Sequence, residues 1–329
     1  MLRKDLQAIP GYVAGKKFPG AVKLSSNEMS TPPLPGVVEA LRTVEPNRYP
    51  DIASTELVDA LAAEFGHPVT VGCGSSALCQ QLVQVTCYDH TDEVIFPWRS
   101  FEAYPIFVDV VGATKVAVPL ENEEVPLDTM AAAVTDNTRL IFVCNPNNPS
   151  GTAHTLEEIT AFCEKIPSDV VIAIDEAYIE FADVDTAVPL LDRFENVVIL
   201  RTFSKAYGLA GLRVGYAIAT QDIIEALGKV SIPFAVSGYA QQAALASLRA
   251  SDELADRVRE TREQVARVVQ ATKCVPSQAN FVWFPGHTLD LTAHGVVVRN
   301  FPEGTRITVT IAEETDTLLA ALEAEGLTR

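Results

Sequence analysis

Positive charge is scarce in this sequence of 329 residues. Lysine and arginine number 25 against 43 aspartates and glutamates, so the formal net charge is −18 at pH 7. A surface of this sign repels the phosphates of nucleic acids and the headgroups of anionic membranes, so we expect neither as a partner. An anionic small molecule would need a locally basic pocket inside the acidic shell.

Long apolar runs are also missing, since no stretch approaches the roughly 18 apolar residues of a membrane span. Residues 1–10 lack the apolar core of a secretory signal, so we expect a cytoplasmic protein. The six cysteines form no C-x-x-C pair, and no two histidines stand at i and i+4. We therefore expect buried, reduced thiols and no metal site.

What the sequence does contain is an alternation of short apolar runs and amphipathic helical stretches. The expected strands are rich in Val, Ile, Leu and Phe, which is typical of strands covered on both faces. They are Glu93–Phe96, Lys115–Pro119, Arg139–Cys144, Val170–Asp175, Val197–Arg201 and Arg213–Ala219. The expected helices are Ser76–Thr86, Glu102–Val111, Thr155–Lys165 (opened by a capping box) and Leu190–Phe194. The alternation predicts a three-layer α/β/α fold with a mostly parallel sheet.

Three segments are expected along the chain. Residues 1–45 contain many prolines and glycines and are interpreted as an N-terminal arm that ends in a short helix. Residues 46–235 form the large domain. Residues 236–329 form a smaller α+β domain. Its expected elements are a long charged helix, Ser251–Lys273, the short strands Ala279–Phe284, Val296–Asn300 and Arg306–Ile311, and a closing helix, Glu313–Ala324.

Polar side chains follow three of the expected strands. Asn148 lies in an Asn- and Pro-rich segment after the third strand, Asp175 ends the fourth, and Lys205 follows the fifth. Taken singly, these are an ordinary turn and a solvent-exposed lysine. However, an acid at the end of a very apolar strand is costly to bury unless a cation meets it. Because ligands bind at the carboxyl ends of parallel strands, we expect the three residues to share a site.

The same segments resemble the aspartate-aminotransferase fold family (fold type I) of pyridoxal-phosphate (PLP) enzymes. The motifs N-P-N-N-P-S-G, D-E-A-Y and S-K-A-Y-G-L-A-G-L-R occur in the family's order and spacing. Shorter pieces at 10–16, 23–28, 47–51, 72–76, 298–301 and 305–309 extend the resemblance along the whole chain. Within the family the sequence looks most like the branch of histidinol-phosphate and aromatic (phenylalanine) aminotransferases. The resemblance implies a large PLP-binding domain over 46–235.

The resemblance implies roles around the cofactor ring. Lys205 would form a Schiff base with the PLP aldehyde and, once displaced by the substrate amine, would move the Cα proton. Asp175 would pair with the ring nitrogen, which keeps the ring an electron sink. Asn148 and Tyr178 would hydrogen-bond the ring hydroxyl. Phe101 matches the aromatic residue that stacks on the ring, although a core aromatic at a helix start is the alternative.

The resemblance also implies a phosphate site. Arg213 would grip the phosphate with its planar fork. Its helpers would be Thr202, Ser204, Gly74, Ser75 and Ser76. The last three precede an expected helix whose N-terminus attracts anions, although they could also be an ordinary N-cap. Tyr49 matches a tyrosine that reaches the phosphate of the neighbouring subunit, so the resemblance implies a homodimer.

Four residues are candidates for substrate binding. Arg306, and with it Arg299, would bind carboxylates, with exposure at a strand end as the alternative for each. Tyr12 and Asn27 match arm positions that close over the substrate, unless they only pack the arm. The sequence departs from the family at Ser150 (usually Thr), at residues 29–32 and at Thr310 (often Gly). The last two departures lie near the expected substrate and bear on specificity.

These features predict a PLP-dependent aminotransferase that exchanges an amino group between an amino acid and a 2-oxo acid. The segment Trp98–Ile106 and the surroundings of Tyr12 look like the aromatic subgroup, so phenylalanine or tyrosine is the expected donor and 2-oxoglutarate the acceptor. Histidinol-phosphate transamination and decarboxylation on the same fold are the alternatives. A domain that only binds a ligand is a further alternative, which the joint presence of Lys205, Asp175 and Arg213 disfavours.

Overall fold

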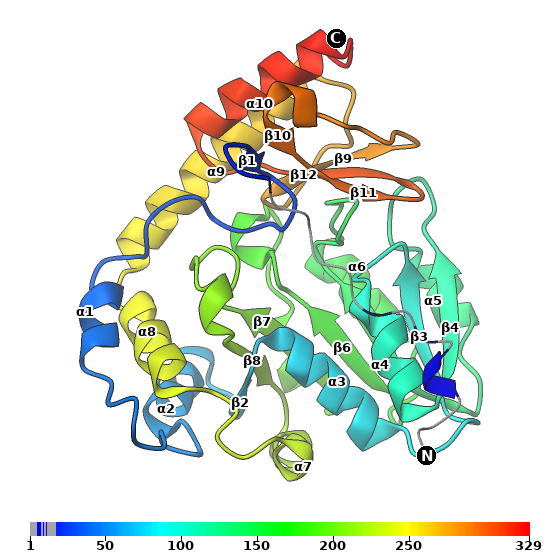
Figure 1. Ribbon diagram of the computed structural model, residues 1–329. Coiled ribbons are helices and arrows are strands. Elements are labelled where there is room, and N and C mark those ends of the chain that lie inside the picture. The colour runs from blue at the N-terminus through cyan, green and yellow to red at the C-terminus, as the bar shows by residue number, and fades with distance from the viewer. Residues whose placement is uncertain (1–4, 8, 10, 12–17) are drawn as a thin grey trace.

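A mixed sheet of seven strands organises the described part of the chain, which in this computed structural model is residues 5–7, 9, 11 and 18–329 (Figure 1). Its spatial order is β2 (Val69–Gly72), β8 (Gly215–Ile218), β7 (Val197–Thr202), β6 (Val171–Asp175), β5 (Thr138–Cys144), β3 (Glu93–Trp98) and β4 (Thr114–Pro119). Strands β7, β6, β5, β3 and β4 run parallel to one another, and β8 runs antiparallel to both of its neighbours. The six strands expected from the sequence are all in this sheet.

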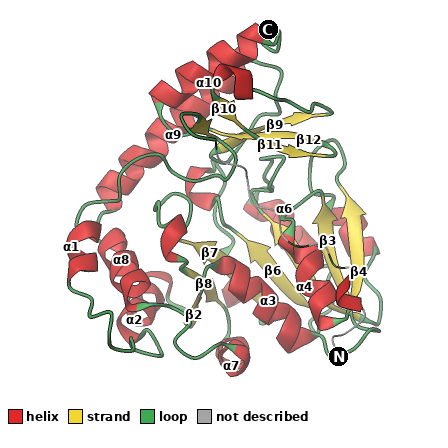
Figure 2. Ribbon diagram, in the orientation of Figure 1, coloured by secondary structure: helices red, strands yellow, loops and turns green. Residues whose placement is uncertain are grey.

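Helices cover both faces of the sheet, as Figure 2 shows. On one face lie α3 (Ser75–Thr86), α4 (Ala103–Val111) and α7 (Gln221–Val230). On the other lie α2 (Thr55–Phe65), α5 (Leu127–Ala132), α6 (Leu156–Cys163) and α8 (Gly238–Leu248). Alternate residues of β6 serve the two cores: Ala173 packs on the first face, and Ile172 and Ile174 pack on the second. The three-layer α/β/α prediction is confirmed.

Local differences from the expected elements have local causes. The helix α6 begins at the predicted capping box, in which Thr155 and Glu158 bond each other's backbone N–H. The stretch expected as helix at Leu190–Phe194 is instead a short 3₁₀ helix, Val188–Asp192. The strand expected from Arg213 starts only at Gly215, because Arg213 has a left-handed backbone (φ 57°). Strand β2 and the helices α2, α5, α7 and α8 were not expected.

The C-terminal part stands above the main sheet in Figure 1. It contains a three-stranded antiparallel sheet of β11 (Arg299–Phe301), β12 (Gly304–Thr308) and β9 (Phe281–Pro285), and the helices α9 (Ser251–Ala271) and α10 (Ala312–Ala324). The N-terminal segment joins it, because β1 (Val22–Lys23) pairs in parallel with β10 (Val296–Val297).

Helix α8 lies beyond the predicted domain boundary at residue 235. It nevertheless packs on α1 (Val37–Arg42) and α2 and contributes alanines such as Ala240 and Ala243 to the core beneath the main sheet. The division into segments 1–45, 46–235 and 236–329 remains a prediction.

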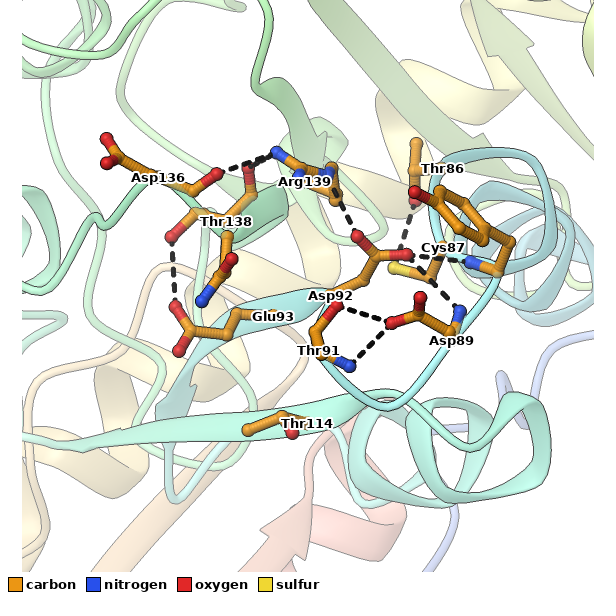
Figure 3. A network of polar contacts seen from close by, with 12 residues as sticks. Thr86, Cys87, Asp89, Thr91, Asp92, Glu93, Thr114, Asp136, Thr138 and Arg139 are labelled. Carbon is orange, nitrogen blue, oxygen red and sulfur yellow. Dashed lines mark hydrogen bonds and ion pairs between the residues drawn. The ribbon is translucent and has the colours of Figure 1, made fainter.

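A polar network holds the amino-terminal ends of β3 and β5 together (Figure 3). The buried carboxylate of Asp92 accepts hydrogen bonds from the backbone of Tyr88 and from Nε of Arg139, both at 2.9 Å. Because these contacts tie the loop before β3 to the neighbouring strand, they fix the relative position of two strands whose opposite, carboxyl ends carry the site described below.

The cysteines are all free thiols, and five of the six are buried. Cys73 is exposed, which corrects the expectation of burial for this residue, because it lies in the turn between β2 and α3. Among the described residues, no group of His, Cys, Asp and Glu side chains could hold a metal ion. No helix in the same part of the chain has the length and apolar character needed to cross a bilayer.

Candidate active site

A cavity of about 460 Å³ opens at the carboxyl ends of β5, β6 and β7. The three strands are neighbours in the sheet, so the expected convergence of Asn148, Asp175 and Lys205 is observed. The predicted site residues that line the cavity are Ser75, Ser76, Phe101, Asn148, Asp175, Tyr178, Thr202, Ser204, Lys205, Arg213, Arg299 and Arg306. Basic groups outnumber the acidic Glu28 and Asp175 in this lining, as an anionic ligand requires.

Asp175 is the last residue of β6 and its side chain is almost wholly buried. Oδ2 accepts a hydrogen bond from the hydroxyl of Tyr104 at 2.7 Å, and Oδ1 accepts one from the backbone N–H of Ala177 at 3.2 Å. Burial raises the pKa of Asp175 to about 6 despite these two donors. A cation brought into the cavity would reverse this effect, so the carboxylate is suited to meet a positively charged group.

Lys205 lies in the loop after β7, and its Nζ donates to the backbone carbonyl of Ser26 at 3.3 Å. Burial, together with the neighbouring charges of Arg306 and Arg213, lowers the pKa of Lys205 to about 7. A large fraction of the amine is therefore neutral near pH 7, which makes it a nucleophile and a proton acceptor.

An anion cradle lies where α3 begins. Arg213 Nη1 donates to the Ser204 hydroxyl at 3.3 Å, and that hydroxyl also accepts from Thr202 Oγ1 at 2.9 Å. Gly74 precedes the helix with φ 75°, and a Cβ there would collide with the guanidinium of Arg213. Glycine is thus required both by the backbone and by the close approach of the arginine. The helix N-terminus, two hydroxyls and a guanidinium together have the chemistry to hold an anion.

The two arginines of the small sheet face the cavity from its other side. Arg306 on β12 is buried and donates to the side-chain oxygen of Asn148 and to the carbonyl of Ser25. Arg299 on β11 donates to Oε2 of Glu102 at 2.8 Å. The charge of Arg299 is therefore partly neutralised within the protein.

Tyr178 and Asn27 form one unit. The Tyr178 hydroxyl accepts a hydrogen bond from Nδ2 of Asn27 at 2.9 Å, and Asn27 is itself tied to Thr308 by its backbone N–H and its side-chain oxygen. Asn27 is buried behind Tyr178 and is not among the residues that line the cavity. In this arrangement Asn27 orients Tyr178.

Tyr49 is another predicted residue that does not line this cavity. Tyr49 lies on the surface with 82% exposure, where its ring stacks on Phe234 with centroids 4.5 Å apart. Tyr12 falls outside the described residues.

Sequence reasoning assigned no role to Tyr104, Glu102 or Ser26, which contact Asp175, Arg299 and Lys205 respectively. Tyr104 stands three residues after Phe101 at the start of an expected helix, and this spacing places both near one face. The contacts of Glu102 and Ser26 join distant parts of the chain and had no local signal.

Residues 19–322 match the model of the family described as aminotransferase class I and II. The chain belongs to this family. The resemblance noted in the sequence is thereby confirmed, and the protein is an aminotransferase.

The similar proteins include an aromatic amino acid aminotransferase of Corynebacterium glutamicum. It is 58% identical over 339 residues, which cover 98% of this chain and 99% of that protein. An aromatic amino acid aminotransferase of Rhodococcus erythropolis is 49% identical over 343 residues, with 98% and 96% covered.

Solved structures agree on the fold. Histidinol-phosphate aminotransferase from Sinorhizobium meliloti, in complex with pyridoxal-5'-phosphate, superposes with a TM-score of 0.85 and 28% identity over 92% of this chain and 90% of that one. Aspartate aminotransferase from Thermus thermophilus, a tetra mutant, superposes with a TM-score of 0.81 and 23% identity over 98% of each chain.

Proposed function

We propose that the protein is a PLP-dependent aminotransferase that takes its amino group from phenylalanine or tyrosine and delivers it to 2-oxoglutarate. The observation that carries the proposal is the meeting of Lys205, Asp175 and Arg213 around one cavity at the ends of β6 and β7. The high identity to aromatic amino acid aminotransferases over nearly the whole chain supports the choice of donor.

The groups present fit PLP. The cradle of Arg213, Ser204 and the α3 N-terminus suits its phosphate, and the absence of a Cβ at Gly74 lets Arg213 lie close to that N-terminus. Asp175, whose buried carboxylate needs a cation, suits the protonated ring nitrogen. Asn148 and Tyr178 line the same cavity with polar atoms for the ring hydroxyl, and Phe101 offers an aromatic face.

The protein's own residues then have separate tasks. When bound, PLP supplies an aldehyde for the substrate amine and a ring that accepts the electrons released at the substrate Cα. Lys205 Nζ, a substantial fraction of which is neutral near pH 7, removes the proton from that Cα and later returns a proton. Asp175 keeps the ring nitrogen protonated, and Arg306 holds the substrate carboxylate in the orientation that presents the Cα proton to Lys205.

The lining favours an uncharged side chain over a phosphorylated one. Phe101, Ile106 and Phe107 contribute apolar surface to the cavity, and Arg299 is already paired with Glu102. A phosphate and the second carboxylate of 2-oxoglutarate would each have to draw Arg299 away from Glu102, so it is the apolar lining that favours an uncharged side chain in the donor. The test is a kcat/KM panel of phenylalanine, tyrosine, histidinol phosphate and leucine, each with 2-oxoglutarate. Phenylalanine and tyrosine should have the highest kcat/KM. A higher kcat/KM for histidinol phosphate would show that the protein is instead a histidinol-phosphate aminotransferase.

Arg306→Lys should lower kcat/KM for phenylalanine and for 2-oxoglutarate alike. Both substrates carry a carboxylate next to the reacting carbon, and a lysine cannot reproduce the two-point contact of the guanidinium. We expect a loss of roughly 1.5–3 kcal/mol in each half-reaction, the value of a charge-assisted hydrogen bond. Single-turnover kinetics with each substrate measures it. Arg267→Lys, at a surface pair with Asp316, is the matched control.

Arg299→Ala should slow the half-reactions with the two substrates to different extents. A second carboxylate is present in 2-oxoglutarate and absent from phenylalanine, so the loss of this cation should weaken the half-reaction with 2-oxoglutarate much more. The same single-turnover measurements decide the point, and equal losses for both substrates would contradict a division of labour between the arginines.

We further propose that the active form is a cytoplasmic homodimer in which Tyr49 reaches the phosphate of the neighbouring site. Support comes from the exposed apolar side chains of Tyr49, Ile52, Ile232 and Phe234, the first and last of which are stacked together. Exposed apolar groups gathered in this way are typical of protein interfaces.

Tyr49→Phe should weaken PLP retention modestly, by about 1–3 kcal/mol for a lost hydrogen bond to a charged group. Hybrid dimers with a Lys205→Ala chain test the cross-subunit placement. One hybrid site should carry both lesions, and the other should have wild-type affinity for PLP. Hybrids in which no wild-type site appears would refute the placement.

A further inference from the structure

A buried tyrosine stands directly behind Asp175. Tyr104 belongs to α4, is fully shielded from solvent and does not line the cavity. Its hydroxyl donates to Oδ2 of Asp175 at 2.7 Å, the usual distance for a well-formed O–H···O hydrogen bond. The residue has no role in the function proposed above.

Aromatic packing holds the Tyr104 ring in place. The ring stacks on Phe142 of β5, with centroids 4.4 Å apart and planes 8° from parallel. The edge of Phe101 meets it at 5.4 Å and 89°. A ring fixed from two sides has little freedom to rotate, so the hydroxyl is directed at one carboxylate oxygen before any ligand binds.

The hydroxyl can only donate in this contact. Burial, reinforced by the negative charge of Asp175, raises the pKa of Tyr104 well above its ordinary value, so the phenol keeps its proton. A donor of this kind favours the carboxylate over the carboxylic acid. Together with the N–H of Ala177 on Oδ1, it leaves lone pairs on both oxygens for a partner in the cavity. The other titratable groups that influence Asp175 or are influenced by it are Cys79, Cys144, Glu176, Tyr178 and Lys205.

We propose that Tyr104 is a positioning residue that aims Asp175 at the ring nitrogen of the cofactor and makes this carboxylate a weaker base, so that the shared proton stays on the ring. The inference rests on the proposed PLP chemistry. Without the hydroxyl, Asp175 would become more basic and would draw the proton away from the ring, which weakens the ring as an electron sink.

The first test uses the protein without cofactor. In Tyr104→Phe the ring and its stacking remain and only the donor is lost. The pKa of Asp175, followed by the ¹³C resonance of its carboxyl group, should rise by about one pH unit, as expected for one hydrogen bond to a charged group. Tyr207→Phe removes the hydroxyl of another buried tyrosine, whose ring packs on Phe203, and should leave the pKa of Asp175 unchanged. An equal pKa of Asp175 in Tyr104→Phe and the wild type would overturn the proposal.

The second test uses the holoenzyme loaded with ¹⁵N-labelled PLP. The ring-nitrogen resonance should move toward that of neutral pyridine in Tyr104→Phe and stay in place in Tyr207→Phe. The kcat for phenylalanine should fall about tenfold, with little change in KM, because ground-state binding is untouched. An unshifted nitrogen resonance would contradict the assigned role even if activity fell.

A third measurement does not depend on the folding of Tyr104→Phe. In the wild-type apoprotein the Cζ resonance of Tyr104 should follow the titration of Asp175 near pH 6, and Asp175→Asn should abolish this response. A Tyr104 resonance that ignores the titration would overturn the proposal. Failure of the wild type to bind PLP would instead refute the proposed function. The two apoprotein measurements distinguish this outcome from a failure of the Tyr104 proposal, because neither of them requires PLP.

Discussion

Lys205→Ala should abolish multiple turnover while PLP still binds without a covalent bond. The side chain combines two tasks, the covalent attachment of the cofactor and the proton transfer at the substrate Cα, and no other lysine lines the cavity among the described residues. Loss of the proton transfer alone costs about 10²–10⁴ in rate. Steady-state assays with phenylalanine measure turnover, and borohydride reduction followed by peptide mapping locates covalent cofactor.

Lys229→Ala, an exposed lysine at the end of α7, is the matched control and should keep full activity and covalent cofactor. Covalent PLP trapped at a different lysine in Lys205→Ala would refute the assignment.

The stability of the apoprotein gives a second measurement on Lys205. Because the native pKa of Lys205 is about 7 and the ordinary value is 10.5, the unfolded chain binds more protons between these pH values. Wild-type apoprotein should therefore gain stability from pH 7 to 10.5 relative to Lys205→Ala, which urea unfolding can follow.

Asp175→Asn should lower kcat at least about a hundredfold, or roughly 2.7 kcal/mol in activation free energy. Asparagine has nearly the shape of aspartate and its Oδ1 can still accept the Tyr104 hydrogen bond, but it has no charge to keep the ring nitrogen protonated. The measurement is kcat for phenylalanine in a variant whose PLP content equals that of the wild type.

The fold should survive the Asp175→Asn substitution, and the stability of the apoprotein tests this expectation. The native pKa of Asp175 is about 6 against an ordinary 3.8, so the folded state binds more protons between these values and the wild type loses stability as pH rises through them. Asp175→Asn lacks this loss and should be the more stable apoprotein above pH 6. Asp92→Asn, in the buried network at the other end of the sheet, tests the general effect of removing a buried carboxylate. Near wild-type turnover in Asp175→Asn fully loaded with PLP would show that Asp175 is not needed to keep the ring nitrogen protonated.

The sequence by itself determined the layers of the fold and the chemistry at the strand ends. The runs at 140–144 and 172–174 are apolar at consecutive positions and are buried throughout, as expected of strands covered on both faces. Parallel neighbours place their carboxyl ends at one edge, so the sequence alone predicts that Asn148, Asp175 and Lys205 converge. Their motifs were long enough to identify the family.

Other features depended on contacts between distant segments. Edge strand β2 has four residues and a weak pattern, and it is a strand only because β8 pairs with it. The sequence allowed Asn27 either to contact the substrate or to pack the arm. Its burial and its contacts with Thr308, 281 residues away, and with Tyr178 had no local signal.

The electrostatic character of the site was also decided by the tertiary structure. The low pKa of Lys205 arises from burial beneath the N-terminal segment and from Arg306 on a strand about a hundred residues further along the chain. The partner of Asp175, Tyr104, comes from a helix 71 residues earlier. Residue types and local spacing set which groups reach the strand ends, but desolvation and charge coupling depend on which distant groups surround them, and only the folded chain brings those groups together.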